Sequence, residues 1–309
     1  MRPLIATLVV QVLLGSVLIA LVATGNVPFV GDAPRGAESR SQQLGDAAAA
    51  TTRADRFDEQ RALEWLRVQV RYGPRPAGSR ASRRLAARLR RALPRGTYQA
   101  LPDGLRNVIG TVPGRDAGRT VVVGAHYDTK DIPKFVGAND GASGTAVVTQ
   151  LARTIRPRTL GPTVKFILFD GEESPRGAPD SEFERRGLRG SRAAARRYDE
   201  AEAMVLLDFV GNKGLSLRRE GNSDPALWRK MRQAAGRSGF SSAFPAGDVG
   251  AVSDDHVPFI RRGVPSIDLI DYGFLTGPCW HRRCDDLSGV SVRSLDAAGE
   301  STLELLRRL

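Results

Sequence analysis

The sequence has 309 residues, is 41% hydrophobic and carries a formal charge of +12, which allows one sizeable α/β core or at most two small ones. The positive charge is mostly arginine and is spread over helical patterns such as residues 80 to 93, which we interpret as a solvated basic face. There is no glycine-rich phosphate loop, zinc-finger spacing or aromatic-basic stripe, so we expect no nucleic-acid partner.

The first segments of the chain are expected to lie outside the folded domain. Residues 1 to 30 carry a charge only at Arg2 and are otherwise apolar enough to cross a bilayer. They fit either a cleaved signal peptide, with Leu21 and Ala23 before the cut, or an uncleaved anchor, which the uninterrupted length favours. We therefore expect a protein that is membrane-anchored facing the extracytoplasmic side, or secreted. Residues 31 to 54 lack apolar periodicity and are expected to form a flexible linker.

From residue 55 onward, helical and strand patterns alternate. Helices are expected over residues 57 to 70, after Ser79, after Asp140, over 191 to 198 and 224 to 239, from Asp254 or Asp255, and through Leu295, Leu303 and Leu306. Strands are expected over residues 107 to 112, 120 to 127, 163 to 170, 204 to 209 and 266 to 270. This alternation predicts a layered α/β sandwich, with residues 55 to 309 as one catalytic-size domain.

The rest of the chain is organised around residues 121 to 145. A strand-like apolar run ends in His126 and Asp128, and a loop then leads to Asp140 at the start of a helical pattern. Open α/β sheets have their sites at the carboxyl ends of strands. Three later stretches also end an apolar run in a carboxylate or a histidine: residues 166 to 174, 206 to 209 and 278 to 281.

With these blocks in this order, residues 60 to 309 resemble the zinc-dependent aminopeptidases and glutaminyl-peptide cyclotransferases, the peptidase M28-like superfamily. The resemblance implies a three-layer α/β sandwich of the zinc exopeptidase type, with a central mixed, mostly parallel sheet. It also implies a zinc-dependent enzyme that acts on the amino termini of peptides or proteins. One zinc ion is expected, or two in the aminopeptidase branch.

The resemblance implies a set of metal ligands. Asp140, Glu173 and His281 match the ligands of the metal that both branches retain. His126 and Asp208 match the ligands of a second metal in the aminopeptidase branch, where Asp140 bridges the pair. Histidine and carboxylate groups are the ligands that catalytic zinc sites use.

Two further acidic residues have implied roles beside these ligands. Glu172 matches the general base of the family. The spacing is consistent with this role, since neighbouring side chains of an extended chain project to opposite sides and can divide the two tasks. Asp128 is expected to orient His126 rather than to bind metal. Taken alone, Glu172 and Glu173 also fit a solvated loop pair. Asp208 in an apolar strand is harder to explain in that way, because an isolated buried carboxylate is costly.

Several features favour the cyclotransferase branch. The stretch HYDTK, the block DDHVPFIRRGVP at residues 254 to 265 and Trp280 directly before His281 look like the cyclotransferases, with Trp280 in the substrate pocket. Asp254 would then join Asp208 in a hydrogen-bonded acid network that takes part in catalysis. We therefore expect a glutaminyl-peptide cyclotransferase, which converts an amino-terminal Gln to pyroglutamate and releases ammonia.

Other features favour different activities. DGASG at residues 140 to 144 looks more like the aminopeptidases, and Asp268 and Arg282 depart from the residues usual in animal cyclotransferases. The alternative is a di-zinc aminopeptidase that releases amino-terminal residues from peptides. A second alternative is an inactive membrane-tethered binding ectodomain, which would require a missing ligand or base.

The only two cysteines flank a candidate ligand. Cys279 and Cys284 lie on either side of Trp280 and His281. Disulfides persist outside the cytoplasm, and a loop this short can bring two Cα atoms within bonding range. We predict a disulfide that fixes the His281 loop. Taken alone, Trp280 and His281 also fit a packed aromatic pair.

Overall fold

The computed structural model describes residues 56–309 of the chain. The expected signal or anchor segment at residues 1 to 30 and the expected linker at 31 to 54 lie outside the described residues. Within residues 56–309, no helix has both the length and the apolar character that a membrane span requires.

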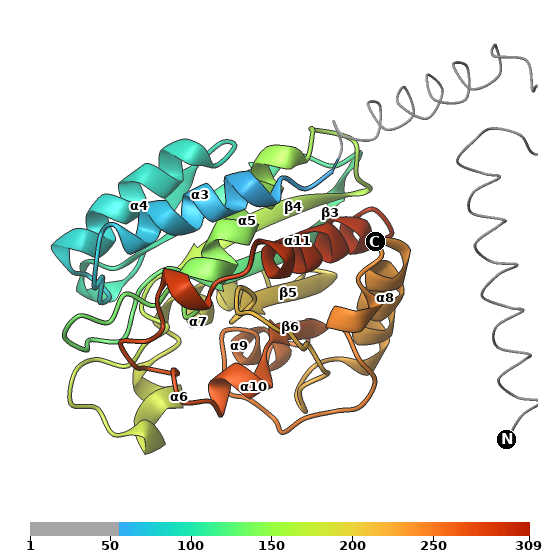
Figure 1. The fold of residues 1–309 in the computed structure, drawn as a ribbon. Helices are drawn as coiled ribbons and strands as arrows, with labels where there is room; N and C mark the ends of the chain where they lie inside the picture. The colour runs from blue at the N-terminus through green and yellow to red at the C-terminus, as the bar shows by residue number, and fades with distance from the viewer. Residues whose placement is uncertain (1–55) are drawn as a thin grey trace, which may run out of the picture. The chain divides into compact units, whose positions relative to one another are not determined.

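Six strands form one mixed sheet in the order β1–β2–β4–β3–β5–β6 (Figure 1). The strands are β1 Thr97–Ala100, β2 Arg106–Val112, β3 Asp116–His126, β4 Pro162–Phe169, β5 Ala203–Asp208 and β6 Ser266–Ile270. β4, β3, β5 and β6 pair in parallel, whereas β2 is antiparallel to both β1 and β4. The parallel strands therefore end at one edge of the sheet, which we call the carboxyl edge.

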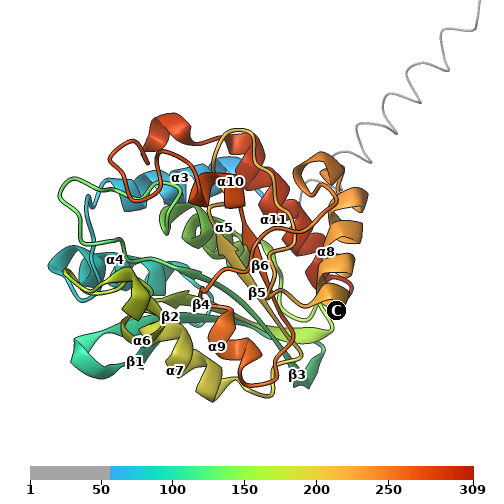
Figure 2. The ribbon, with the colours of Figure 1, turned by 90° about the horizontal axis from the view of Figure 1, so that it is seen from below.

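Helices cover both faces of the sheet and give the domain three layers (Figure 2). The larger helical layer contains α3 Glu59–Val70, α4 Arg80–Ala92, α5 Ala142–Thr154, α8 Pro225–Arg237 and α11 Val292–Leu306. The smaller layer contains α7 Arg189–Arg197 and α9 Val257–Ile260. Successive side chains of a strand point to opposite faces. Val121 and Val123 accordingly pack in the core under the larger layer, and Val122 packs in the core under the smaller one.

The predicted three-layer sandwich with a mixed, mostly parallel sheet is confirmed. Every predicted strand is present, and Ser79 caps α4 by accepting a hydrogen bond from the backbone N–H of Ser82. The helix expected from Asp254 or Asp255 begins only at Val257, because Pro258 sits in its first turn and has no N–H to extend it backwards.

Some short elements were not predicted. The edge strand β1 is mostly exposed and has no apolar alternation to indicate a strand. The helices α6 Phe183–Arg186 and α10 Tyr272–Leu275 are too short to produce a helical period. Four single 3₁₀ turns lie at Pro102–Gly104, Asp180–Glu182, Ser241–Ala243 and Leu287–Gly289.

Candidate metal centre

The candidate site residues come from several elements that meet at the carboxyl edge. His126 is the last residue of β3, and Asp208 is the last residue of β5. Asp140 lies just before α5, and the intervening Gly141 has φ +83°, a left-handed conformation that glycine adopts without strain. A Cβ at Gly141 would lie 2.8 Å from the carbonyl oxygen of Asp128, so the turn that presents Asp140 also requires the small residue.

The first group of candidate ligands is Asp140, Glu173 and His281. The Nε2 atom of His281 lies 3.1 Å from Glu173 Oε1 and 3.4 Å from Asp140 Oδ2. Asp140 Oδ2 and Glu173 Oε1 are buried and have no hydrogen-bond partner among the described residues. Buried carboxylate oxygens are rarely left without a partner. One nitrogen and two unpartnered oxygens facing one point therefore fit a zinc ion.

The second group is His126, Asp140 and Asp208. The Nε2 atom of His126 lies 3.3 Å from Asp140 Oδ1 and 3.4 Å from Asp208 Oδ1. One ligand atom from each residue can be chosen so that all lie within 4.8 Å of one another. Asp140 therefore faces the first group with Oδ2 and the second group with Oδ1, the arrangement of a carboxylate that bridges two metal ions. The residues fit either one zinc ion or two.

A pocket of about 330 Å³ opens beside these ligands. Its lining combines the candidate metal ligands with acidic, aromatic and aliphatic side chains: Lys130, Asp140, Glu172, Glu173, Asp180, Phe183, Asp208, Phe209, Ala251, Val252, Ser253, Asp254, Ile270, Tyr272, Leu275, Trp280 and His281. A pocket lined by both apolar and charged side chains is typical of a small-molecule or single-side-chain site.

Glu172 lines this pocket, and its pKa differs from that of an ordinary glutamate. Its Oε2 atom is 3.7 Å from Nδ1 of His126, and its side chain is almost completely buried. Burial raises the pKa of Glu172 well above its usual range; His126 opposes this shift, and the carboxylates of Glu173 and Asp254 increase it. A carboxyl group with a raised pKa is better suited to take up and return a proton than an ordinary glutamate.

Asp208 and Asp254 both line this pocket, and their side chains are buried. Burial raises the pKa of Asp208 to about 8, and the nearby charge of Asp254 adds to this shift. Burial also raises the pKa of Asp254. Two buried carboxylates that repel each other favour holding a proton between them unless a cation lies nearby. Asp208 can therefore either hold a proton or contribute to metal binding.

Asp128 holds the segment that carries Glu172 and Glu173. Its two oxygens accept hydrogen bonds from the backbone N–H groups of these residues, each at 3.3 Å. Its Oδ1 atom lies 3.8 Å from Nδ1 of His126, longer than a hydrogen bond. The main contacts of Asp128 are therefore with the glutamate segment, a role that the sequence analysis did not anticipate.

Asp285 and Arg75 support the Asp140 loop, and neither was singled out from the sequence. The two oxygens of Asp285 accept hydrogen bonds from the backbone N–H groups of Asn139 and Asp140, at 2.7 and 3.0 Å. Arg75 is fully buried and donates to the carbonyl oxygens of Tyr127, Val136 and Gly137. Residues 139 and 285 are far apart in sequence, so only their meeting in the fold reveals these contacts.

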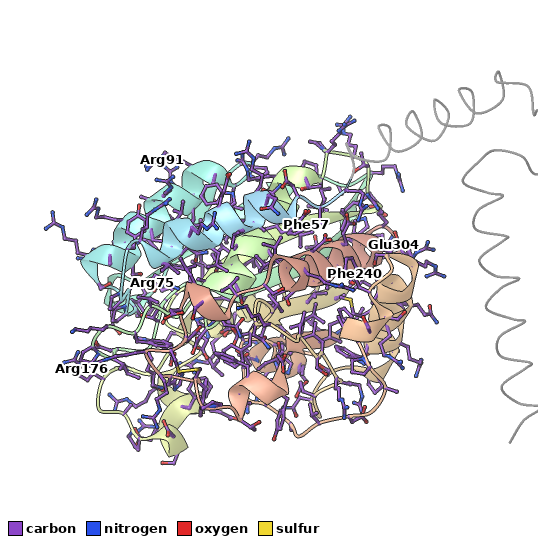
Figure 3. All side chains as sticks on the ribbon, viewed as in Figure 1. Phe57, Arg75, Arg91, Arg176, Phe240 and Glu304 are labelled. Carbon is purple, nitrogen blue, oxygen red and sulfur yellow. A yellow bond between two sulfur atoms is a disulfide. The ribbon has the colours of Figure 1, made fainter. Side chains whose placement is uncertain are left out.

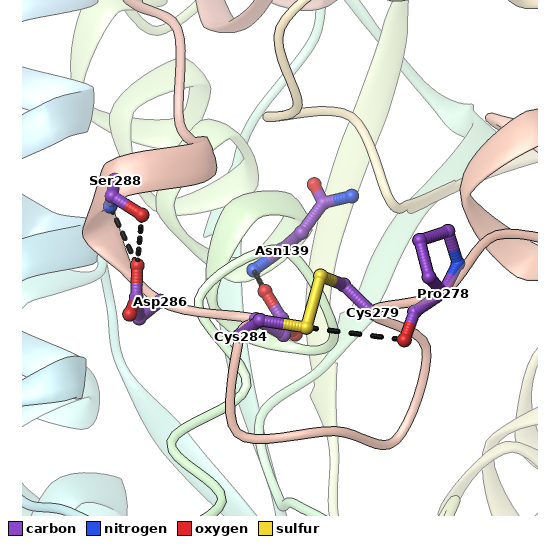
Figure 4. Close-up of a disulfide and its surroundings, with 7 residues drawn as sticks. Asn139, Pro278, Cys279, Cys284, Asp286 and Ser288 are labelled. Carbon is purple, nitrogen blue, oxygen red and sulfur yellow. Dashed lines mark hydrogen bonds between the residues drawn. A yellow bond between two sulfur atoms is a disulfide. The ribbon is translucent and has the colours of Figure 1, made fainter.

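The loop that carries His281 is closed by a disulfide between Cys279 and Cys284, whose Cα atoms are 5.3 Å apart (Figure 4). His281 has φ +52°, an uncommon conformation for a residue other than glycine. Its ring stacks on that of Trp280, with the ring centroids 4.3 Å apart. A closed loop and an aromatic stack together restrict the orientation of this candidate ligand.

A second group of buried ionisable side chains contains His256, Glu220 and Asp268. His256 Nε2 is 3.1 Å from Glu220 Oε1, and both side chains are fully buried. Asp268 is also fully buried, and neither carboxylate oxygen has a hydrogen-bond partner among the described residues. Because His256 lies two residues after Asp254, its contact with Glu220 anchors the segment that carries Asp254. Glu220 was not identified from the sequence, since it lies in no motif.

Comparisons with known proteins agree with this geometry. The model of "Peptidase family M28" matches residues 107–306. Glutaminyl-peptide cyclotransferase of Bothrops jararaca is 30% identical over 248 residues, which cover 65% of this chain and 65% of that protein. Aminopeptidase YwaD of Bacillus subtilis is 29% identical over 194 residues, which cover 58% of this chain and 39% of that protein.

Solved structures are similar over almost their whole length. Glutaminyl cyclase of Porphyromonas gingivalis superposes with a TM-score of 0.71 at 30% identity, covering 82% of this chain and 98% of that one. By contrast, the chain spans only 61% and 65% of the length of two of the curated cyclotransferases that it matches. Because the family model covers well over half of the sequence, the chain belongs to peptidase family M28.

Proposed function

We propose that this protein is a zinc-dependent glutaminyl-peptide cyclotransferase, which converts an amino-terminal Gln to pyroglutamate and releases ammonia. The observation that carries the proposal is that Asp254 and Trp280, the cyclotransferase-like residues of the sequence, line the same pocket as Glu172 and the candidate ligands. The 30% identity to a cyclotransferase and to a glutaminyl cyclase supports it. In this proposal the substrates are the amino termini of peptides or proteins.

The reaction requires a base, an acid and an oriented substrate. A zinc ion held by Asp140, Glu173 and His281 would polarise the γ-amide carbonyl of the substrate Gln. Glu172 takes a proton from the α-amine as its nitrogen attacks the γ-carbon, and then gives that proton to the departing amide nitrogen, which leaves as ammonia. Asp208 and Asp254, which line the same pocket, would hold the substrate amine, while Trp280 would exclude water from the Gln side chain.

The second candidate function is a di-zinc aminopeptidase. The observation that favours it is the complete second group of ligands, His126, Asp140 and Asp208, which share the carboxylate of Asp140 with the first group. In that reaction Glu172 would take a proton from water and pass it to the leaving amine. We do not propose an inactive binding ectodomain, because Glu172 and every candidate ligand border the site.

Substrate turnover and metal content separate the two candidates. We expect purified protein to hold one zinc ion per chain, measured by elemental analysis, and to release ammonia from a peptide that begins with Gln. The matched control is the same peptide beginning with Asn, whose shorter side chain would close a strained ring. Two zinc ions per chain, release of free Leu from a Leu-initiated peptide and no ammonia from the Gln peptide would establish the aminopeptidase instead.

The cellular location is part of the proposal. The apolar character of residues 3 to 30 supports an extracytoplasmic protein that is either anchored or secreted. Fractionation tests this: full-length protein that resists carbonate extraction from membranes is anchored, and a mature form that begins shortly after Ala23 is secreted. Recovery of the intact chain in the cytoplasm would contradict both.

A further inference from the structure

One stretch of the chain is strongly and exclusively basic. Residues 65 to 102 contain no Asp or Glu, and they carry ten arginines: Arg67, Arg71, Arg75, Arg80, Arg83, Arg84, Arg88, Arg90, Arg91 and Arg95. Arg75 is buried, where it supports the Asp140 loop, but most of the other arginines are exposed. The stretch covers the second half of α3 and all of α4, and the side chains of α4, such as Arg91, project from its outer side (Figure 3).

The arginines gather around a groove between α3 and α4. The groove has a volume of about 570 Å³ and is lined by Val68, Arg71, Tyr72, Arg80, Ala81, Arg84 and Arg88. All four lining arginines are exposed, and within residues 56–309 none of them has a carboxylate partner. We call these four residues and their groove the basic groove.

Several exposed arginines elsewhere in the domain are paired with a carboxylate. Arg176 binds Asp131 with two hydrogen bonds, at 2.9 and 2.7 Å, and Arg261 binds Glu184 at 2.6 Å. Arg119 binds both oxygens of Glu202. Other exposed arginines, such as Arg229 and Arg237 on α8, also form no ion pair within residues 56–309, so the basic groove is distinguished by the gathering of four unpaired arginines around one hollow. Four unpaired guanidinium groups around one groove attract an anion from outside the domain.

Aromatic rings lie among these arginines. The guanidinium of Arg84 lies 5.9 Å from the ring centre of Tyr72, and that of Arg90 lies 5.2 Å from the ring centre of Tyr98. Tyr98 is one of the few large hydrophobic side chains that are exposed. Exposed aromatic and arginine side chains in one surface are typical of proteins that contact the headgroup region of a bilayer.

We propose that the basic groove docks the domain on an anionic lipid bilayer by binding the phosphodiester headgroups. Charge complementarity requires an anionic partner, and a bilayer is favoured over a nucleic acid because the same chain has an uncharged apolar segment of membrane-spanning length at residues 3 to 30. No residue lines both this groove and the active pocket, so docking leaves the pocket open to substrate. The proposal is independent of the reaction that the pocket catalyses.

Vesicle binding by the domain alone tests this docking. Residues 55–309 form a compact unit and match nearly the whole of a solved cyclase chain, so they can be prepared without the apolar segment. The probes are vesicles of phosphatidylcholine, with and without about 30% phosphatidylglycerol. We expect flotation with the anionic vesicles only, at about 0.1 M salt, and loss of binding at about 0.5 M salt.

Matched variants distinguish binding at the basic groove from general electrostatic attraction to the vesicles. Arg80→Gln/Arg84→Gln/Arg88→Gln should weaken binding to the anionic vesicles at least about tenfold, since each arginine near such a surface contributes about a fivefold factor. The control Arg229→Gln/Lys230→Gln/Arg237→Gln removes the same charge from α8, at the opposite side of the domain from α4, and should weaken binding less than about threefold. Equal losses in both variants, equal binding to neutral and anionic vesicles, or tighter binding to RNA than to vesicles would overturn the proposal.

Discussion

The acidic centre and the basic groove each concentrate side chains of one charge, but they differ in burial and in how their residues are spaced along the chain. The acidic centre, which we define as Asp140, Glu172, Glu173, Asp208 and Asp254, is almost completely buried, and its members come from four separate segments of the chain. The basic groove is exposed, and its arginines lie within 18 consecutive positions, residues 71 to 88.

Burial explains what each region needs. Like charges on a surface are solvated and screened, so the basic groove is stable without a partner and can exchange one. Buried carboxylates cannot remain charged together without a cation or a proton. The acidic centre therefore requires a bound cation or protons, whereas the basic groove requires only a reversible contact.

The largest expected effect is on the chemical step. Glu172→Gln keeps the shape of the side chain but removes the base, so turnover should fall about 10²- to 10⁴-fold. Zinc content should be unchanged, because Glu172 is not one of the proposed ligands. Glu64→Gln on α3, next to the basic groove, is the control and should retain full activity. A Glu172→Gln enzyme with wild-type turnover would remove Glu172 from the mechanism.

Zinc retention should distinguish the two groups of candidate ligands. His281→Ala removes a ligand that both candidate functions require, and this variant should lose its zinc during dialysis. His126→Ala should keep one zinc ion if the protein is a cyclotransferase. Elemental analysis of both variants gives the answer, with wild-type protein dialysed in parallel. Loss of zinc from His126→Ala but not from His281→Ala would reverse the assignment of the primary site.

Removing the side chain that supports the Asp140 loop should have a smaller, indirect effect on zinc binding. Asp285→Ala frees the backbone N–H groups of Asn139 and Asp140 from their shared carboxylate. Zinc affinity should fall about 10- to 100-fold, as is usual when a group that orients a ligand is lost. Competition with a chelator measures this change directly. Asp286→Ala, which removes the neighbouring, partly exposed acid that bonds Ser288, is the matched control and should leave affinity unchanged.

The disulfide of the His281 loop should contribute a modest amount of stability. Replacing both cysteines by serine frees a loop whose ends are five positions apart, which by chain entropy lowers the free energy of unfolding by about 2 kcal/mol. Thermal unfolding of zinc-loaded and zinc-free protein measures the loss. We expect a larger loss with zinc, because the loop carries a ligand. Equal losses in the two forms would separate the disulfide from metal binding.

The smallest effect concerns the pH dependence of the zinc-free domain. Burial raises the pKa of Asp208 to about 8 and that of Asp285 to about 7, both above the value of an unfolded chain. The stability that these protons provide is complete below about pH 4 and is lost as the pH rises through these values.

Thermal unfolding at about pH 5 and about pH 8.5 tests this dependence. Zinc-free protein should unfold at least about 3 °C lower at the higher pH, the shift that roughly 1 kcal/mol produces in a domain of this size. The drop should shrink in Asp208→Asn, whose side chain does not titrate. A zinc-free domain whose unfolding temperature rises over this range would show that the acidic centre is not protonated.

Much of the fold was predictable from the sequence because its signals are local. Apolar runs such as residues 121 to 123 indicate buried strands wherever they occur, and the positions of His126, Asp140 and Asp208 after such runs indicate the edge at which they meet. Their assignment as metal ligands remains a prediction, although the structure brings them together. The edge strand β1 was missed because an exposed strand carries no such signal.

The sequence alone determined the α/β class, the order of the elements, the candidate ligands and the basic character of residues 65 to 102. Only the tertiary structure revealed that Asp285 holds the Asp140 loop, that Asp128 holds the glutamate segment, and that Asp140 faces two groups of ligands with its two oxygens. The reason is physical. Local patterns record whether a side chain is buried, whereas a hydrogen bond between residues 145 positions apart depends on how the strands are ordered in the sheet.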